Sequence, residues 1–272
     1  MPDNGINMKN NTMRNLSSRE TEIIARLAYE KAAVVTAGQF DRYFKFPSLL
    51  RNKIIYRLTK KGIFRTIKRG VYFFSPLESG AAGSNINEFL IPPIFFPKGN
   101  YYIGYSSMYN YYGLTDQLFQ VIYILNTSMQ KEKAIGSMRF KMVKTSQKRM
   151  YGLEKIRVKD ADVIVSDRER TLVDLIYFPE PVGGMEKAFE ILKEQIKGRK
   201  TDTAKLIKYA LKFPDNSTIK RIGYILEKAG LNDRTLMPLL KAAKKTSLIN
   251  LYPSKSRKGK ISKKWMVIEN AA

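Results

Sequence analysis

Hydrophobic residues near the start of the chain recur first with helical spacing and then with strand spacing. The first group lies on one helical face: Ile23, Ile24, Leu27 and Ala28. Ser17-Ser18 is a suitable cap for this helix, with Glu20 or Glu22 in its first turn. A short extended piece at 33–35 follows. Thr36 and Gln39 then have the spacing of a capping box that opens a second helix toward Tyr43.

A third helix and a hairpin are predicted next. Phe46-Pro47 breaks the second helix, and Ser48 is expected to cap a helix over 49–61 that Gly62 ends. Extended runs at 63–67 and 71–74 flank a tight turn at 68–70. Three helices followed by a two-stranded wing are the element order of a winged helix-turn-helix.

The third helix has two chemically different faces. At about 100° per residue, Leu50, Ile54 and Leu58 align on one side. The opposite side carries polar and cationic residues, namely Asn52, Lys53, Tyr56 and Lys60, with Arg57 at its edge. Arg51 falls nearer the apolar side. A recognition helix needs this division, because one face must pack while the other reaches bases and phosphates.

The charge distribution points to the same place. The chain of 272 residues has 49 Lys and Arg against 24 Asp and Glu, a formal net charge of +25 that favours a polyanionic partner. Residues 42–77 hold ten of these cations and no acid. Phosphate proximity would produce this depletion of acids, although a generic basic surface on a basic protein is the alternative.

We expect double-stranded DNA to be contacted in three ways. Asn52, Lys53 and Tyr56 would reach base edges in the major groove, where Asn can pair with adenine and Lys with guanine. Phosphates would be held by Ser48, Arg57, Lys60 and Lys61, and Arg51 could also reach one from the first turn. The wing would lie along the backbone or in the minor groove through Arg65, Lys68 and Arg69.

The residue types that are missing exclude many chemistries. The chain has no Cys and no His, which removes disulfides, thiolate nucleophiles, thiolate- or imidazole-bound metals and Ser–His triads. We therefore expect no enzyme activity, no cofactor and no metal. Carboxylate–metal chemistry survives this argument. The acids at 162, 167, 169 and 174 leave a metal-dependent nuclease tethered to a DNA-binding module as an alternative, although helix capping and local ion pairs explain them better.

Beyond residue 100 the pattern predicts a mixed domain that becomes mainly helical. Strands are expected at 120–125, 138–143 and 162–165, with weaker candidates at 101–104 and 155–158. Helices are expected after Ser106, from the capping-box spacing of Ser166 and Glu169 through residue 177, and over 185–196, 202–212, 217–228 and 233–244, with short strands near 248–251 and 265–268. Two basic segments, 131–159 and 241–264, are either solvated loops or a second polyanion-binding surface. Trp265 is expected to pack in the core.

Five segments, in order, resemble the AbiEi family, the antitoxins of AbiE-type bacterial toxin–antitoxin systems. They are Leu58–Tyr72, Tyr105–Thr115, Val163–Asp174 with its Arg-Glu-Arg-Thr-Leu-Val-Asp string, Ile219–Glu227 and Trp265–Asn270. The resemblance spans about residues 18–270. It implies a repressor that binds inverted repeats in its own promoter through an N-terminal domain. It also implies a C-terminal domain that counteracts a nucleotidyltransferase-like toxin, in many members without a stable complex.

Together these observations predict an α+β protein with an N-terminal winged helix-turn-helix. The expected organisation is a disordered tail at 1–16, a DNA-binding domain at 17–76, a linker at 77–99 and an antitoxin-type α/β domain at 100–272. We expect a monomer in solution that pairs on DNA. We do not expect the polar N-terminus to be a signal peptide, and the sequence has no apolar run of transmembrane length, so we expect a cytoplasmic protein without a membrane partner. A non-specific nucleic-acid-binding protein is the remaining alternative.

Overall fold

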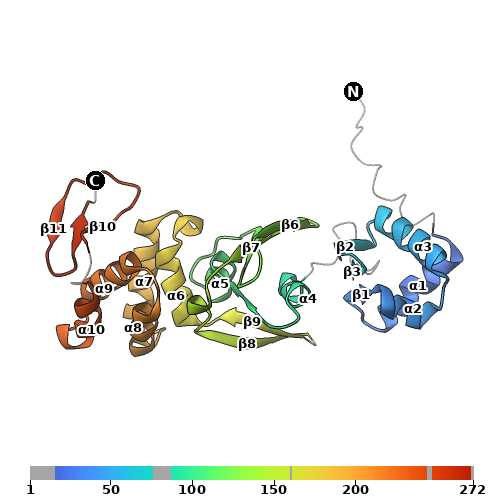
Figure 1. The fold of residues 1–272 in the computed structure, drawn as a ribbon, viewed down its shortest axis with the longest axis horizontal. Coiled ribbons are helices and arrows are strands. Elements are labelled where there is room, and N and C mark those ends of the chain that lie inside the picture. The colour runs from blue at the N-terminus through green and yellow to red at the C-terminus, as the bar shows by residue number, and fades with distance from the viewer. Residues whose placement is uncertain (1–15, 76–86, 160, 244–246, 271–272) are drawn as a thin grey trace, which may run out of the picture. The chain divides into compact units, whose positions relative to one another are not determined.

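The computed structural model describes residues 16–75, 87–159, 161–243 and 247–270. The fold is mixed α+β, and the chain divides into two compact units, Met1–Asn87 and Glu88–Ala272 (Figure 1). Residues 1–15 of the predicted tail and 77–86 of the predicted linker lie outside the described residues. Residues 88–99, the last part of the predicted linker, contribute η2 (Glu88–Leu90) and α4 (Pro92–Phe95) to the second unit.

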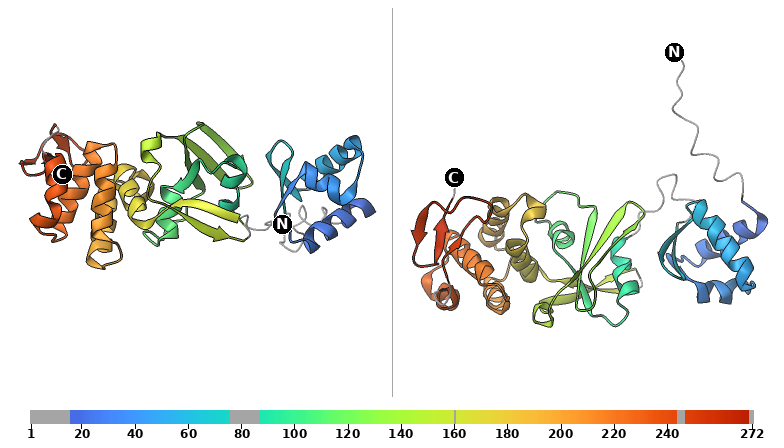
Figure 2. Two further views of the ribbon diagram at one scale, coloured as in Figure 1. Left: turned by 60° about the horizontal axis from the view of Figure 1, so that its bottom comes forward. Right: turned by 45° about the horizontal axis from the view of Figure 1, so that its top comes forward.

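Within residues 16–75, the first unit contains three helices and three short strands. Their order is α1 (Ser18–Tyr29), β1 (Val34–Thr36), α2 (Ala37–Phe44), α3 (Ser48–Lys60), β2 (Phe64–Lys68) and β3 (Val71–Phe74). The strands form an antiparallel sheet in the order β1-β3-β2. Figure 2 shows this sheet packed on one side of the helices, around a core that includes Ile23, Leu27, Phe40, Ile54 and Leu58.

Local capping explains where two of these helices begin. Ser17 caps α1 as expected and forms a reciprocal capping box with Glu20, and Thr36 and Gln39 form the capping box at α2 that their spacing predicts. The predicted cap at Ser48 is wrong. Pro47 is the N-cap residue, with ψ 143, and Ser48 is already the first residue of α3, with no side-chain cap bond. Because the extended backbone at Pro47 marks the boundary, Ser48 takes helical geometry instead of capping.

A six-stranded mixed sheet opens the second unit, in the order β6-β7-β5-β4-β9-β8. Its strands are β4 (Tyr101–Gly104), β5 (Val121–Asn126), β6 (Lys131–Ile135), β7 (Met138–Lys144), β8 (Leu153–Val158) and β9 (Ala161–Ser166). The pairs β4–β9 and β5–β7 are parallel, and the others are antiparallel. Among the six strands of this sheet, only β6 was not predicted. Three of its five residues are charged, which is typical of an edge strand.

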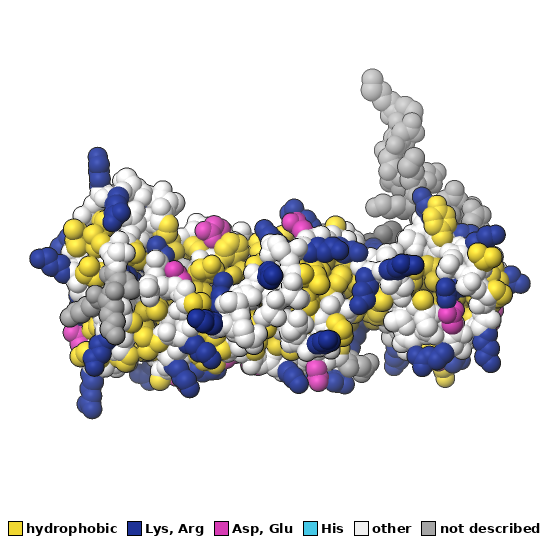
Figure 3. All heavy atoms as spheres, in the orientation of Figure 1, with side chains coloured by type: hydrophobic (Ala, Val, Ile, Leu, Met, Phe, Trp, Pro, Cys, Tyr) yellow, Lys and Arg dark blue, Asp and Glu magenta, His cyan; other side chains and the backbone are white. Residues whose placement is uncertain are grey.

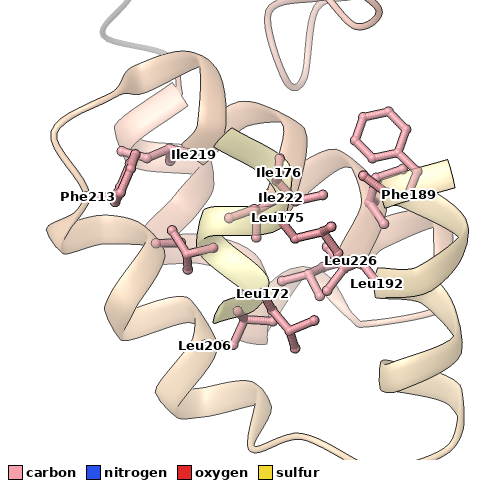
Figure 4. Packing of buried hydrophobic residues seen from close by; sticks show 14 of the residues in the cluster. Leu172, Leu175, Ile176, Phe189, Leu192, Leu206, Phe213, Ile219, Ile222 and Leu226 are labelled. Atoms are coloured by element: carbon pink, nitrogen blue, oxygen red, sulfur yellow. The ribbon is translucent and has the colours of Figure 1, made fainter. Parts of the chain in front are cut away.

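Helices make up most of the remaining chain. They are α5 (Ser106–Tyr111) between the strands, then α6 (Arg168–Tyr177), α7 (Met185–Lys197), α8 (Thr203–Lys212), α9 (Asn216–Lys228) and α10 (Asp233–Ala243). Figure 4 shows Leu172 and Leu175 of α6 pointing toward Ile222 and Leu226 of α9. A small sheet follows, in the order β10 (Ile249–Asn250), β12 (Val267–Glu269) and β11 (Lys260–Ser262).

Trp265 lies just before β12 and is fully buried in the core of the second unit, as expected. Its indole Nε1 donates a hydrogen bond to Glu227 at 2.7 Å, and its ring packs directly against Gly223 of α9. A glycine is required at this point of α9, because any larger residue would overlap the indole ring. In the part of the chain that the structure describes, no helix has the length and apolar character needed to cross a membrane.

Candidate nucleic-acid interface

Helix α3 separates an apolar face from a polar face, as its phase predicts. Ile54 and Leu58 are fully buried, and Leu50 is half-buried at the start of the helix. The opposite face is open to solvent and carries Ser48, Asn52, Lys53, Tyr56, Arg57 and Lys60. Tyr56 has 62% of its surface exposed, and the Lys60 ammonium lies 5.7 Å from the centre of its ring. This face therefore presents an amide, a phenol and several cations.

Arg51 lies between the two faces and contacts helix α2. Its Nη1 is 2.5 Å from Oδ2 of Asp41, and only 20% of its side chain is exposed. Its Nε donates a second hydrogen bond, of 3.2 Å, to Oδ1 of Asn52. The guanidinium is thus engaged by α2 and by the neighbouring polar residue, rather than directed outward as a free phosphate contact.

The C-terminal turn of α3 is tied to α1 through Glu20, which is 1% exposed. Lys61 Nζ lies 2.8 Å from Oε2 of Glu20, and Arg57 Nε lies 3.3 Å from Oε1. Burial raises the pKa of Glu20, but the hydrogen bonds from Lys61 and the Ser17 backbone and the charges of Lys61 and Arg57 outweigh it, so the net pKa is lowered. Glu20 is therefore an ionised anchor, and Lys61 is held by it.

The β2–β3 hairpin brings the remaining candidate residues beside α3. Arg65 and Lys68 are half-buried on β2, and Arg69 is exposed at the turn. Gly70 completes the turn with φ +73, a conformation that favours glycine. The Gly70 carbonyl accepts a hydrogen bond of 2.8 Å from the Ala37 backbone at the start of α2. The turn is therefore fastened to the helices instead of projecting freely.

Eleven residues were predicted to contact DNA, and the structure separates them into two groups. Seven are exposed on α3 or at the turn: Ser48, Asn52, Lys53, Tyr56, Arg57, Lys60 and Arg69. Four are half-buried: Arg51, Lys61, Arg65 and Lys68. Figure 3 shows Lys and Arg side chains spread over the visible face of this unit with few acids among them. Asp41 and Glu20 were not predicted as partners of these cations, because neither lies in the acid-free segment.

The acids at 162, 167, 169 and 174 of the second unit contact cations and backbone groups of the protein. Asp167 caps α6 by accepting a hydrogen bond from the Arg170 backbone at 2.8 Å. Lys205 lies 3.1 Å from Asp167 and 2.9 Å from Glu169, and so forms an ion pair with each of them. Burial raises the pKa of Glu169, but the hydrogen bonds from Lys205, Asp202 and Thr201 outweigh it and leave the pKa lowered. No cluster of three potential metal ligands occurs among the described residues.

The other two acids of that group lie elsewhere. Asp162 pairs with Arg157 at 2.9 Å on the surface, at the opposite end of β9 from Asp167. Asp174 is completely buried, with Oδ1 2.7 Å from Arg170 and 3.4 Å from Arg149. The four acids therefore serve three separate structural purposes.

The two basic segments of the second unit lie mostly at the surface. The β6–β7 and β8–β9 hairpins at opposite edges of the sheet carry most of the first segment. In the second segment, Lys255 pairs with Glu186, and Lys264 pairs with Glu227 and Asp233. The exposed residues Lys258, Lys260 and Lys263 have no acidic partner in the described part of the chain. The arrangement leaves both interpretations of these segments open.

No protein-family model and no curated protein matches this chain. A search of solved structures finds the RV2827C protein from Mycobacterium tuberculosis, with a TM-score of 0.69 and 12% sequence identity. The alignment covers 93% of this chain and 92% of the other. At this level of identity the likeness concerns the fold alone, and nearly the whole chain shares it.

Proposed function

We propose that this chain is a DNA-binding repressor with antitoxin activity, and that its first unit is a winged helix-turn-helix. The element order α1-β1-α2-α3-β2-β3 with sheet order β1-β3-β2 supports the fold proposal. The hairpin would be the wing, and α3 the recognition helix. The observation that carries the proposal is the solvent-exposed face of α3, where Asn52, Lys53, Tyr56 and Lys60 lie side by side.

The division of labour on this surface follows from the contacts. Lys53, Lys60, Arg65 and Arg69 have no acidic partner among the described residues and are available for phosphates. Arg57 keeps half of its side chain exposed while Nε faces Glu20, so its terminal amino groups can still reach a phosphate. Arg51 and Lys61, which the sequence suggested as phosphate ligands, are assigned here to holding α3 in place. Asn52, Lys53 and Tyr56 remain the candidates for base contacts.

A competition experiment tests the repressor proposal. The full chain is mixed with a labelled fragment of the DNA upstream of its own gene, and excess random DNA is added. We expect a protected inverted repeat and a complex that survives about a thousandfold excess of random DNA, since specific complexes are typically that much tighter. A complex that random DNA removes in proportion to its concentration would instead indicate a purely electrostatic binder.

The antitoxin proposal rests on the family resemblance and concerns the second unit. A neighbouring gene for a nucleotidyltransferase-like toxin is the expected partner, and neutralisation need not involve a stable complex. The toxin is co-expressed either with the intact chain or with a variant chain that lacks DNA binding, such as Lys53→Ala/Lys60→Ala. The comparison separates neutralisation of the toxin by the second unit from DNA binding by the first. We expect growth rescue by both chains in the cytoplasm. Loss of rescue in the DNA-binding variant would tie neutralisation to repression.

A nuclease function has no comparable support. Lys205 occupies the space between Asp167 and Glu169, where a cation would have to lie. We therefore expect no DNA cleavage when the chain is incubated with magnesium or manganese. Cleavage that disappears in Asp162→Ala would overturn the assignment.

A further inference from the structure

A chain of polar contacts runs from α2 to the exposed face of α3. Asp41 on α2 holds Arg51 at 2.5 Å through Nη1, and Arg51 Nε donates to Oδ1 of Asn52 at 3.2 Å. Arg51 is mostly buried, whereas Asn52 is exposed. The acid, the guanidinium and the amide therefore form a relay that ends on a candidate base-reading side chain.

The chemistry of these groups determines which way the Asn52 amide faces. A guanidinium nitrogen can only donate, and the amide nitrogen of Asn cannot accept, so the atom that faces Arg51 must be the oxygen. The two N–H groups of Nδ2 are then the part of this exposed amide that Arg51 does not engage. In a duplex groove, Asn52 would present both donors of Nδ2, while one of the two lone pairs of Oδ1 is already taken by Arg51.

We propose that the Asp41–Arg51 pair sets the base preference of Asn52 and directs it to guanine. This proposal rests on the DNA-binding function proposed above. An Asn that reads adenine uses both ends of its amide, because the oxygen accepts from N6 while the nitrogen donates to N7. With Oδ1 turned toward Arg51 and one of its lone pairs taken, the free part of the amide is Nδ2, so Asn52 is better matched to guanine, which offers two adjacent acceptors, N7 and O6. Arg51 and Asp41 are thus positioning residues that act through Asn52.

The test measures affinity for operator fragments that carry each of the four bases at each position of one half-site. Asn52→Ala first identifies the position that Asn52 reads, because only there does the preference between bases become flat. In the unmodified chain we expect guanine to be favoured at this position by about tenfold, the size of one good base contact. A preference for adenine at that position would overturn the proposal.

Two further variants test the relay itself. Arg51→Lys keeps the charge and a partner for Asp41 but removes the Nε donor, which frees the Asn52 oxygen. We expect the guanine preference to fall and adenine to gain at this position, while preferences at all other positions stay the same. Asp41→Asn, which weakens the anchor without altering α3, should give a smaller shift in the same direction and keeps the test valid if Arg51→Lys folds poorly.

Lys60→Ala is the matched control on the same helix, and it should weaken binding equally for all four bases. If the Arg51 and Asp41 variants behave as this control does, the relay has no part in specificity and the inference is wrong, while the repressor proposal stands. If the unmodified chain binds no operator specifically, both proposals fail together. The two failures are therefore distinguishable.

Discussion

The carboxylate of Glu20 and the ammonium of Lys61 lie 2.8 Å apart, although 41 residues separate them along the chain. Glu20 also accepts a hydrogen bond of 2.9 Å from the Ser17 backbone, which completes the capping box of α1. One buried side chain thus fixes the start of α1 and the end of α3. Because this contact anchors the end of α3, the orientation of the proposed base-reading face on α3 depends on it.

Replacing Glu20 with Ala should destabilise the first unit by about 2–3 kcal/mol, because the cap is lost and Lys61 is left without this partner. The only tryptophan, Trp265, lies in the second unit, so its fluorescence cannot report the change. Hydrogen exchange of the α1 and α3 amides in the full chain provides the measurement. Glu22→Ala, an exposed acid on the same helix, is the control and should shift exchange by less than about 0.5 kcal/mol. Equal effects in the two variants would show that Glu20 is not an anchor.

The stability that Glu20 provides should depend on pH. Its pKa in the folded chain is lowered below the ordinary value of 4.5, so its contribution is fully present above that pH. The contribution should disappear as the pH falls through the lowered pKa. We expect the stability difference between the unmodified chain and Glu20→Gln to be constant from about pH 7 to pH 5 and to shrink toward pH 3. A difference that grows with acidification would contradict the assigned direction.

Salt dependence measures how many cations contact phosphate. About four candidate cations on the interface have no acidic partner among the described residues, so log K should fall with log salt with a slope of about −4. Lys53→Ala should reduce the magnitude of this slope by about 0.9 if Lys53 also contacts a phosphate. Lys197→Ala removes the same charge from an exposed position at the end of α7 and should leave the slope unchanged. Equal slopes for both variants would mean that overall charge, not this surface, governs binding.

Buried charge in the second unit gives a stability prediction. Asp174 and Arg170 are both completely buried and lie 2.7 Å apart. Asp174→Ala should destabilise this unit by about 3–5 kcal/mol, since the buried guanidinium loses its counter-charge. Asp162→Ala removes a surface partner of Arg157 and should change stability by less than about 1 kcal/mol. Denaturant unfolding followed by Trp265 fluorescence measures both, and similar midpoints would rule out the proposed role of Asp174.

Close packing of α9 on Trp265 gives another stability prediction. A Cβ at Gly223 would overlap the indole ring, so Gly223→Ala should destabilise the second unit by about 2 kcal/mol and shift the Trp265 emission. At Gly38 in α2 nothing lies within 4 Å of an added Cβ. Gly38→Ala should therefore stabilise the first unit by about 0.5–1 kcal/mol, which hydrogen exchange of α2 would detect. Stabilisation by both changes would mean that the indole ring moves aside at little cost.

Much of the fold was predictable because it depends on interactions between near neighbours. The capping boxes of α1 and α2 join residues three apart, and the phase of α3 follows from its own apolar positions. Strand β3 has the predicted bounds, since a short apolar run and a glycine turn define it locally. Strand β6 was missed because its charged sequence carries no strand pattern, and only pairing with β7 makes it a strand.

The candidate interface also has features that depend on near neighbours and features that depend on tertiary contacts. The sequence by itself determined which residues of α3 face solvent, because helical periodicity separates Asn52, Lys53 and Tyr56 from the apolar side. Only the tertiary structure decided which cations are engaged, since the acids that hold Arg51 and Lys61 lie on α2 and α1. Periodicity is a property of one segment, whereas an ion pair between helices exists only after packing brings distant residues within a few ångströms of each other.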